Sequence, residues 1–144
     1  MKKVDVLMST YNGAKYLKEQ IDSIMNQENV DISITIRDDG SKDNTIPIIE
    51  EMQAKYTDKI RLIKGENRGY KVSFALLLGL ARDDVDYYAF SDQDDVWKKE
   101  KTNMGVEKLQ QGYELYVCSV ENVDENLKHI SLNDFTNGGR SLKS

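Results

Sequence analysis

Residues 87–97 read Tyr87-Tyr88-Ala89-Phe90-Ser91-Asp92-Gln93-Asp94-Asp95-Val96-Trp97. The aromatic and apolar first half is typical of a short buried strand, and this strand ends in three carboxylates within four positions. Carboxylates this close raise one another's pKa unless a cation or hydrogen-bond donors neutralise them. A D-x-D pattern at a strand end therefore favours Mg²⁺ or Mn²⁺, which prefer carboxylate oxygen and complete their shell with substrate phosphates and water. The alternative is an acidic loop in which Asp95 caps the next helix.

The composition of the chain is that of one globular domain. Its 144 residues suffice for a hydrophobic core, with 39% hydrophobic and 31% charged residues. The formal net charge of −5 argues against a nucleic-acid partner, which requires a basic face. Apolar runs fall short of the roughly 20 residues that span a bilayer. Asp5 interrupts any signal-peptide core, so we expect no export. The single Cys118 lies in an apolar run and forms no disulfide framework.

Segments of strand and helix character alternate along the chain. Strands are predicted at residues 4–9, 32–37, 60–64, 87–91 and 115–120, with a helix after each of the first four. The helix at about 70–82 is apolar nearly all round, so we expect it to be sandwiched. The helix after the fourth strand is expected at 98–110. This alternation predicts an α/β fold with a mostly parallel sheet and helices on both faces.

Polar loops follow the first four predicted strands. They are Thr10-Tyr11-Asn12, Asp38-Asp39-Gly40-Ser41, Asn67-Arg68-Gly69 and Asp92-Gln93-Asp94. The carboxyl ends of parallel strands meet at one edge of a sheet, and ligands bind there. The four loops are therefore expected to form one site, which favours a ligand-binding role for the carboxylates over helix capping.

In this order the loops resemble those of the family 2 glycosyltransferases, inverting enzymes with the GT-A fold. The matching pieces are Ser9-Thr10-Tyr11-Asn12, Asp38-Asp39-Gly40-Ser41-x-Asp43, Asn67-x-Gly69 and Asp92-Gln93-Asp94-Asp95. The run from Phe90 to Trp97, with Lys101, looks most like the bacterial branch that builds surface polysaccharide, rhamnosyltransferase-like members included. Lys98-Lys99-Glu100 stands where that branch often has a proline. The resemblance implies a GT-A-like α/β domain with a Rossmann-like sheet, incomplete at its C-terminus.

The resemblance also implies roles for single residues. Tyr11 would lie against the nucleotide base, and Asp39 would accept a hydrogen bond from an imide N–H of that base. Asp92 would reach the ribose or diphosphate, and Asp94 would coordinate Mg²⁺ or Mn²⁺ that bridges the diphosphate. The other nucleotide contacts implied are Thr10, Asn12, Asn67 and Gly69.

Two of these residues have simpler interpretations from the sequence itself. Tyr11 could only pack the turn, and Asn12 could cap the first helix. His129 has two interpretations as well, because some GT-A enzymes use a late histidine as a metal ligand, whereas a lone histidine more often lies on the surface.

The resemblance covers residues 3 to 122. We therefore expect a nucleotide-sugar-binding half at residues 1–122 and the start of an acceptor half, or a frayed tail, at residues 123–144. In this family the catalytic base is an Asp or Glu many tens of residues beyond the D-x-D, so the base is expected beyond Ser144 and no catalytic residue is assigned.

The function implied is metal-dependent transfer of a sugar, with inversion, from a UDP- or dTDP-type donor to a hydroxyl group of a saccharide or lipid-linked saccharide. This would serve bacterial surface polysaccharide synthesis in the cytoplasm, with peripheral association at the inner face of the membrane. Self-association through an exposed apolar patch is also compatible with half a domain. The alternatives are a non-catalytic sugar-nucleotide-binding module and a haloacid-dehalogenase-type phosphatase. Asp92-x-Asp94-x-Val96 fits the phosphatase pattern, which leaves the Asp38–Ser41 loop unexplained.

Overall fold

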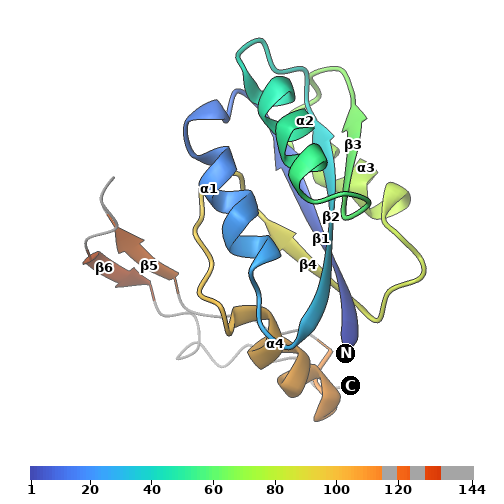
Figure 1. Cartoon of the computed structure of the whole chain (residues 1–144), viewed down its shortest axis with the longest axis vertical. Helices are drawn as coiled ribbons and strands as arrows, with labels where there is room; N and C mark the ends of the chain where they lie inside the picture. The colour runs from blue at the N-terminus through green and yellow to red at the C-terminus, as the bar shows by residue number, and fades with distance from the viewer. Residues whose placement is uncertain (115–119, 124–128, 134–144) are drawn as a thin grey trace. The chain divides into compact units, whose positions relative to one another are not determined.

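The computed structural model describes residues 1–114, 120–123 and 129–133 (Figure 1). The chain forms two compact units, Met1–Thr102 and Asn103–Ser144. All residues of the site discussed below belong to the first unit.

The first unit is built on a parallel sheet of four strands in the order β3-β2-β1-β4. The strands are β1 (Lys2–Thr10), β2 (Val30–Asp38), β3 (Ile60–Lys64) and β4 (Tyr87–Ser91). The two longest strands, β1 and β2, lie at the centre and are buried along most of their length. The predicted α/β fold with a mostly parallel sheet is confirmed.

Helices cover both faces of this sheet. They are α1 (Ala14–Met25), α2 (Thr45–Lys55) and α3 (Tyr70–Leu80). The helices α1 and α2 lie side by side on one face, whereas α3 lies behind the sheet against β1 and β2 (Figure 1). The apolar stripe of α1, formed by Leu17, Ile21 and Ile24, is fully buried. This agrees with the 3.6-residue spacing of these side chains in the sequence.

The face of the sheet under α3 is unusually polar. Strand side chains alternate between faces, and the Ile side chains of β2 alternate with Ser33, Thr35 and Arg37. These three side chains are buried, as is Asp5 of β1. The Oδ1 of Asp5 accepts a hydrogen bond from Ser33 Oγ at 2.9 Å, and its Oδ2 accepts one from Thr35 Oγ1 at 2.8 Å. Polar groups buried in this way are stabilised by hydrogen bonds to one another.

The expectation that α3 is sandwiched is wrong for the part of the chain that the structure describes. Ser73 and Leu77 are buried, but Val72, Leu76 and Leu78 are exposed. The helix packs on the sheet through one face, and its apolar outer face is open to solvent because no second layer of described residues covers it.

The helix after β4 begins later than the sequence suggests. It is α4 (Lys101–Gln110), preceded by a turn in which Lys101 N donates to Lys98 O at 3.1 Å. Asp95 lies six residues before the start of α4, so it does not cap this helix. The interpretation of the carboxylate cluster as a helix cap is therefore wrong.

The second unit contains most of α4 and an antiparallel pair, β5 (Val120–Val123) and β6 (His129–Asn133). Residues 115–119 of the predicted fifth strand, Cys118 among them, lie outside the described residues. None of the helices within residues 1–114 combines the length and the apolar character needed to span a bilayer.

Candidate functional site

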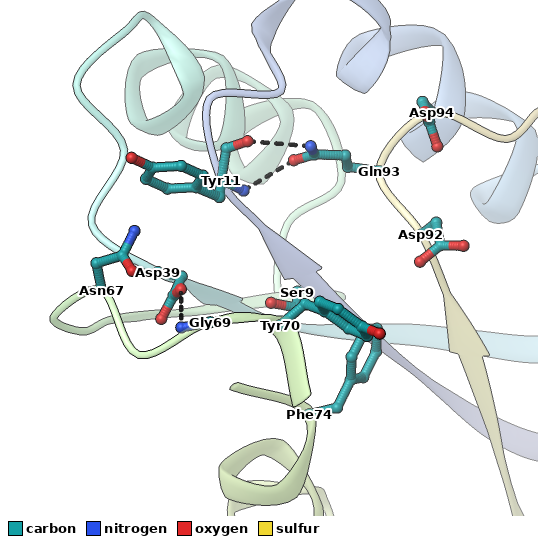
Figure 2. Close-up of a pocket in the computed structure, with 10 residues that line it drawn as sticks. All are labelled: Ser9, Tyr11, Asp39, Asn67, Gly69, Tyr70, Phe74, Asp92, Gln93 and Asp94. Carbon is teal, nitrogen blue, oxygen red and sulfur yellow. Dashed lines mark hydrogen bonds between the residues drawn. The ribbon is translucent and has the colours of Figure 1, made fainter. Parts of the chain in front are cut away.

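A pocket of about 510 Å³ opens at the carboxyl edge of the sheet (Figure 2). Its walls come from the ends of β1, β2 and β4, from the loop after β3 and from the first turns of α3. The lining residues are Ser9, Tyr11, Asp39, Asn67, Gly69, Tyr70, Phe74, Asp92, Gln93 and Asp94. Six of the eight residues predicted to contact nucleotide or metal thus meet here: Tyr11, Asp39, Asn67, Gly69, Asp92 and Asp94.

Asp39 is buried at the end of β2 and is held by three donors. Its Oδ1 accepts hydrogen bonds from Arg37 Nη1 at 2.7 Å and from Arg68 N at 2.9 Å, and its Oδ2 accepts one from Gly69 N at 3.0 Å. Burial acts to raise the pKa of Asp39, but the Arg37 hydrogen bond and the two backbone N–H groups outweigh it, so the pKa lies below its usual value. The side chain is an ionised acceptor at the wall of the pocket.

The loop that supplies these N–H groups depends on glycine. Gly69 precedes α3 with φ of 84° and ψ of 156°, a conformation that only glycine adopts readily. In this conformation its N–H is directed at Asp39 (Figure 2). The Asn67-x-Gly69 piece is thereby tied to the Asp39 loop, although 30 residues separate Gly69 from Asp39.

Asp92 and Asp94 follow β4 at the other end of the pocket (Figure 2). Because β1 lies between β2 and β4, two strand spacings, about 10 Å, separate the strand ends that carry Asp39 and Asp92. Both Asp92 and Asp94 are exposed. The pKa of the neighbouring Asp95 is raised by burial and then by the charges of Asp92 and Asp94, against a smaller opposing effect of Lys101. The D-x-D loop is therefore a concentration of negative charge at the pocket.

The donor set of this loop fits a divalent cation that keeps water and substrate ligands. Within the described residues no cluster of three or more His, Cys, Asp or Glu side chains could hold a metal by itself. Mg²⁺ usually binds through one or two carboxylates together with substrate phosphates. Two exposed carboxylates at the mouth of a pocket, Asp92 and Asp94, match that requirement.

Thr10 and Asn12 do not line the pocket. Thr10 is buried and donates from Oγ1 to Asp38 Oδ1 at 2.8 Å. Asn12 has a positive φ of 46° and does not cap α1, because its Oδ1 accepts from Lys42 N at 2.8 Å and the helix begins after Gly13. The structure shows both residues shaping the loops around the pocket, and their predicted contact with nucleotide stays a prediction.

Four pocket residues, Ser9, Tyr70, Phe74 and Gln93, had no role assigned to them from the sequence. Tyr70 and Phe74 lie one turn apart on α3, and the Phe74 ring packs edge-on against Phe90, with 5.9 Å between centroids. Their i, i+4 spacing on the apolar α3 was a signal of a shared face, but it did not reveal which face borders the pocket. Ser9 and Gln93 complete the set.

The family model for glycosyl transferase family 2 matches residues 5–143. The chain belongs to glycosyl transferase family 2. Its GT-A-like fold and its resemblance to this family are confirmed, and membership decides against the phosphatase alternative.

Among curated relatives of this family 2 chain, the dTDP-rhamnosyl transferase RfbG of Shigella flexneri is 41% identical over 105 residues, which cover 71% of this chain and 36% of the relative. The uncharacterized glycosyltransferase alr2836 of Nostoc is 41% identical over 108 residues, which cover 75% of this chain and 33% of the relative. The chain thus spans about a third of the length of these curated relatives.

Solved structures share the fold of this family 2 chain. The S. aureus TarS 1-349 complex with UDP-GlcNAc is 25% identical with a TM-score of 0.64, covering 76% of this chain and 32% of that one. The mannosyltransferase PcManGT of Pyrobaculum calidifontis, in complex with GDP-Man and Mn²⁺, is 22% identical with a TM-score of 0.66. The match covers 85% of this chain and 35% of that one. The second likeness is one of fold alone.

Proposed function

We propose that residues 1–122 form the nucleotide-sugar-binding half of an inverting glycosyltransferase, and that residues 123–144 begin its acceptor half. The observation that carries the proposal is the pocket itself, which joins an ionised acceptor, Asp39, to a pair of exposed carboxylates, Asp92 and Asp94, along one edge of the sheet. A nucleoside diphosphate needs both kinds of group, because its base presents hydrogen-bond donors and its diphosphate attracts a cation.

The base end of the donor is assigned to the left of the pocket in Figure 2. There the Tyr11 ring stands above Asp39 and Asn67. An aromatic face suits a nucleobase, and the Asp39 carboxylate suits an imide N–H. A uracil or thymine base, as in UDP or dTDP, satisfies both. The relatives named as a dTDP-rhamnosyl transferase and as a UDP-GlcNAc complex support this class of donor.

The diphosphate end is assigned to Asp92 and Asp94. Asp94 would hold Mg²⁺ or Mn²⁺, with Asp92 beside it facing the ribose or diphosphate. When bound, the cation neutralises the charge that develops on the leaving diphosphate. Tyr70 and Phe74 of α3 also line the pocket and give it an aromatic wall.

Transfer requires a second group that these residues do not supply. In direct displacement a base removes the proton of the acceptor hydroxyl, its oxygen attacks the anomeric carbon, and the bond from that carbon to the diphosphate breaks with inversion. We assign the base and the acceptor site to the part of the enzyme beyond this pocket. The acceptor we propose is a saccharide or lipid-linked saccharide of a bacterial surface polysaccharide, used in the cytoplasm at the inner face of the membrane.

A thermal-shift panel tests the donor site. The 144-residue chain is heated with UDP-, dTDP-, GDP- and CDP-sugars, each with and without Mn²⁺. We expect stabilisation by the UDP or dTDP donors that is larger with Mn²⁺, because a ligand that binds only the folded state raises its stability. No stabilisation by any nucleotide sugar would contradict the proposal.

The second candidate is a sugar-nucleotide-binding module without catalysis, because the same pocket can bind a donor whether or not transfer follows. The two are separated by a transfer assay on a version of the protein extended past Ser144. Sugar transfer supports the enzyme, whereas nucleotide binding without transfer to any of a panel of saccharide acceptors supports the module.

A further inference from the structure

Arg37 is a buried cation at the end of β2 that the proposed mechanism does not use. Its side chain is 5% exposed and lies on the polar face of the sheet under α3. Its Nη1 donates to Asp39 Oδ1 at 2.7 Å and to Ser73 Oγ at 3.0 Å, and its Nη2 donates to Glu66 O at 3.0 Å. One guanidinium thus joins β2, α3 and the loop after β3, each of which forms part of the pocket wall.

The neighbours of Arg37 pack closely around its guanidinium group. A Cβ placed on Gly65 would lie 2.3 Å from Arg37 Nη2, so the loop after β3 passes the guanidinium too closely for any other residue to stand at this position without a shift. Ser73 Oγ, which accepts from Arg37, also accepts from Ser9 Oγ at 2.6 Å. The hydrogen bonds to Asp39, Ser73 and Glu66 therefore hold the guanidinium in place, and Gly65 packs against it.

The hydrogen bonds of Asp39 decide what this carboxylate can offer to a ligand. An ionised carboxylate has about four acceptor sites. Arg37 and Arg68 N occupy those of Oδ1, and Gly69 N occupies one of Oδ2. The acceptor capacity that remains is on Oδ2. If the carboxyl were protonated, the three N–H donors would direct the new O–H to that same position, and Asp39 would become a donor to the ligand.

We infer that Arg37 is a positioning residue that keeps Asp39 an acceptor only, and so selects bases that present an N–H group at this position. This inference rests on the proposed nucleotide site. Uracil, thymine and guanine present a ring N–H, whereas the corresponding ring nitrogen of cytosine is an acceptor. A permanently ionised Asp39 binds the first three and repels the fourth. A protonated Asp39 reverses the preference.

Among the described residues, Arg37 is the charged side chain that hydrogen-bonds to Asp39. From β2 the facing cation is Arg37, and the neighbouring Asp38 turns away to accept hydrogen bonds from Thr10 and Ser41. From the loop after β3 the groups that reach Asp39 are the backbone N–H groups of Arg68 and Gly69, and α3 contributes only the neutral hydroxyl of Ser73, through Arg37. Removal of the Arg37 charge therefore leaves burial, which raises the pKa of Asp39, opposed by neutral donors alone.

Arg37→Met tests the inference, because methionine keeps a long side chain without the charge. The affinities of UDP and CDP are measured by calorimetry with Mn²⁺ from pH 5 to pH 8. We expect the wild type to prefer UDP throughout. In the variant the ratio of UDP affinity to CDP affinity should fall with decreasing pH. The fall should reach about tenfold per pH unit once the pH is below the titration midpoint of the Asp39 carboxyl group, which we expect to be raised in this variant. A purely structural role would weaken UDP and CDP alike at every pH.

Arg61→Met is the matched control. Arg61 also lies on a strand of this sheet, but its Nη2 donates to Leu80 O at 2.6 Å and it does not line the pocket. Its replacement should leave the UDP preference and its pH profile unchanged. An equal loss of preference in both arginine variants would overturn the inference.

Carbon-13 NMR of the Asp39 carboxyl group gives a readout that needs no nucleotide. The wild-type midpoint should lie below the ordinary aspartate value of about 3.9, and it should move upward in Arg37→Met. A wild-type midpoint at or above the ordinary value overturns the inference, even if Arg37→Met fails to fold. Arg37→Lys keeps the charge and should retain the low midpoint and the UDP preference. If the wild type binds no nucleotide, the proposed function fails, and the titration still decides whether Arg37 controls Asp39.

Discussion

The side-chain amide of Gln93 forms two hydrogen bonds with the backbone of Tyr11, one with its N–H and one with its C=O. Gln93 Oε1 accepts from Tyr11 N at 2.8 Å, and Gln93 Nε2 donates to Tyr11 O at 3.0 Å (Figure 2). The middle residue of the D-x-D pattern therefore binds the loop after β1, which frees the two flanking carboxylates to line the pocket. The proposed base end and the proposed diphosphate end are joined through this pair of hydrogen bonds.

The contact between Gln93 and Gly13 predicts strong coupling between two substitutions. A Cβ on Gly13 would lie 2.1 Å from Gln93 Oε1 and 2.4 Å from its Cδ, while the φ of −104° at Gly13 suits any residue. We expect Gly13→Ala to lower the free energy of unfolding by roughly 1–3 kcal/mol, since it overfills a packed site. In a Gln93→Ala background the clash is absent, so Gly13→Ala should cost much less. Urea unfolding of the four proteins measures the coupling, and additive effects would show that Gln93 is free to move aside.

Asp94→Ala should remove the dependence of nucleotide binding on metal. If the cation bridge is the main contribution, the affinity for UDP or dTDP in the presence of Mn²⁺ falls by several kcal/mol, whereas the affinity without metal changes little. Calorimetry with and without Mn²⁺ measures both. Asp83→Ala is the control, because this exposed carboxylate precedes β4 and does not line the pocket. Equal affinities in wild type and Asp94→Ala, or no effect of metal on either, would reject the metal assignment.

Asp39→Asn should weaken binding of a uracil- or thymine-type nucleotide by roughly 1–3 kcal/mol, the cost of a lost charge-assisted hydrogen bond. The variant also places an amide among the donors Arg37 Nη1, Arg68 N and Gly69 N, so the free energy of unfolding falls as well. Calorimetry and urea unfolding on the same samples separate the two effects. A folded variant with unchanged affinity would mean that Asp39 serves only to anchor the loop before α3.

The pair of Asp31 and Lys59 predicts a small acid-dependent loss of stability. The Lys59 hydrogen bond, 2.6 Å long, lowers the pKa of Asp31 against a smaller effect of burial. A carboxyl with a lowered folded-state pKa stabilises the fold above the unfolded value of about 3.9, and this stabilisation is lost as the pH falls through the folded value. Both side chains are more than a third exposed, so we expect about 0.2–1 kcal/mol. Urea unfolding from pH 2 to pH 7 should show a shallower acid limb for Asp31→Asn than for wild type, and parallel limbs would exclude the pair as a source of stability.

The order of strands and helices could be predicted from the sequence because it depends on local patterns. Apolar runs of strand length alternate with 3.6-residue stripes such as Leu17, Ile21 and Ile24, and this alternation leads to a parallel sheet. The convergence of Tyr11, Asp39 and Asp92 in one pocket also followed from the sequence, since parallel strands bring their carboxyl ends to one edge.

The alternation of polar side chains in β2 could not show whether these side chains are buried or exposed to solvent. Ser33, Thr35 and Arg37 share a face by the two-residue period of a strand, but that period does not say whether water or a helix lies above them. The tertiary structure places α3 there, so Arg37 is buried beside Asp39 and becomes part of the site rather than part of the surface. The exposed outer face of α3 was missed for the same reason, because an all-apolar helix does not show how many of its sides are covered.

The sequence by itself thus determined which residues reach the carboxyl edge of the sheet, because local periodicity and parallel pairing suffice for that. Only the tertiary structure decided which of them bind one another. Gln93 and Tyr11 are 82 positions apart, and they meet because β4 pairs directly with β1. Such partners depend on the strand order β3-β2-β1-β4, which is set by the packing of the whole unit and which the local pattern of any single segment does not contain.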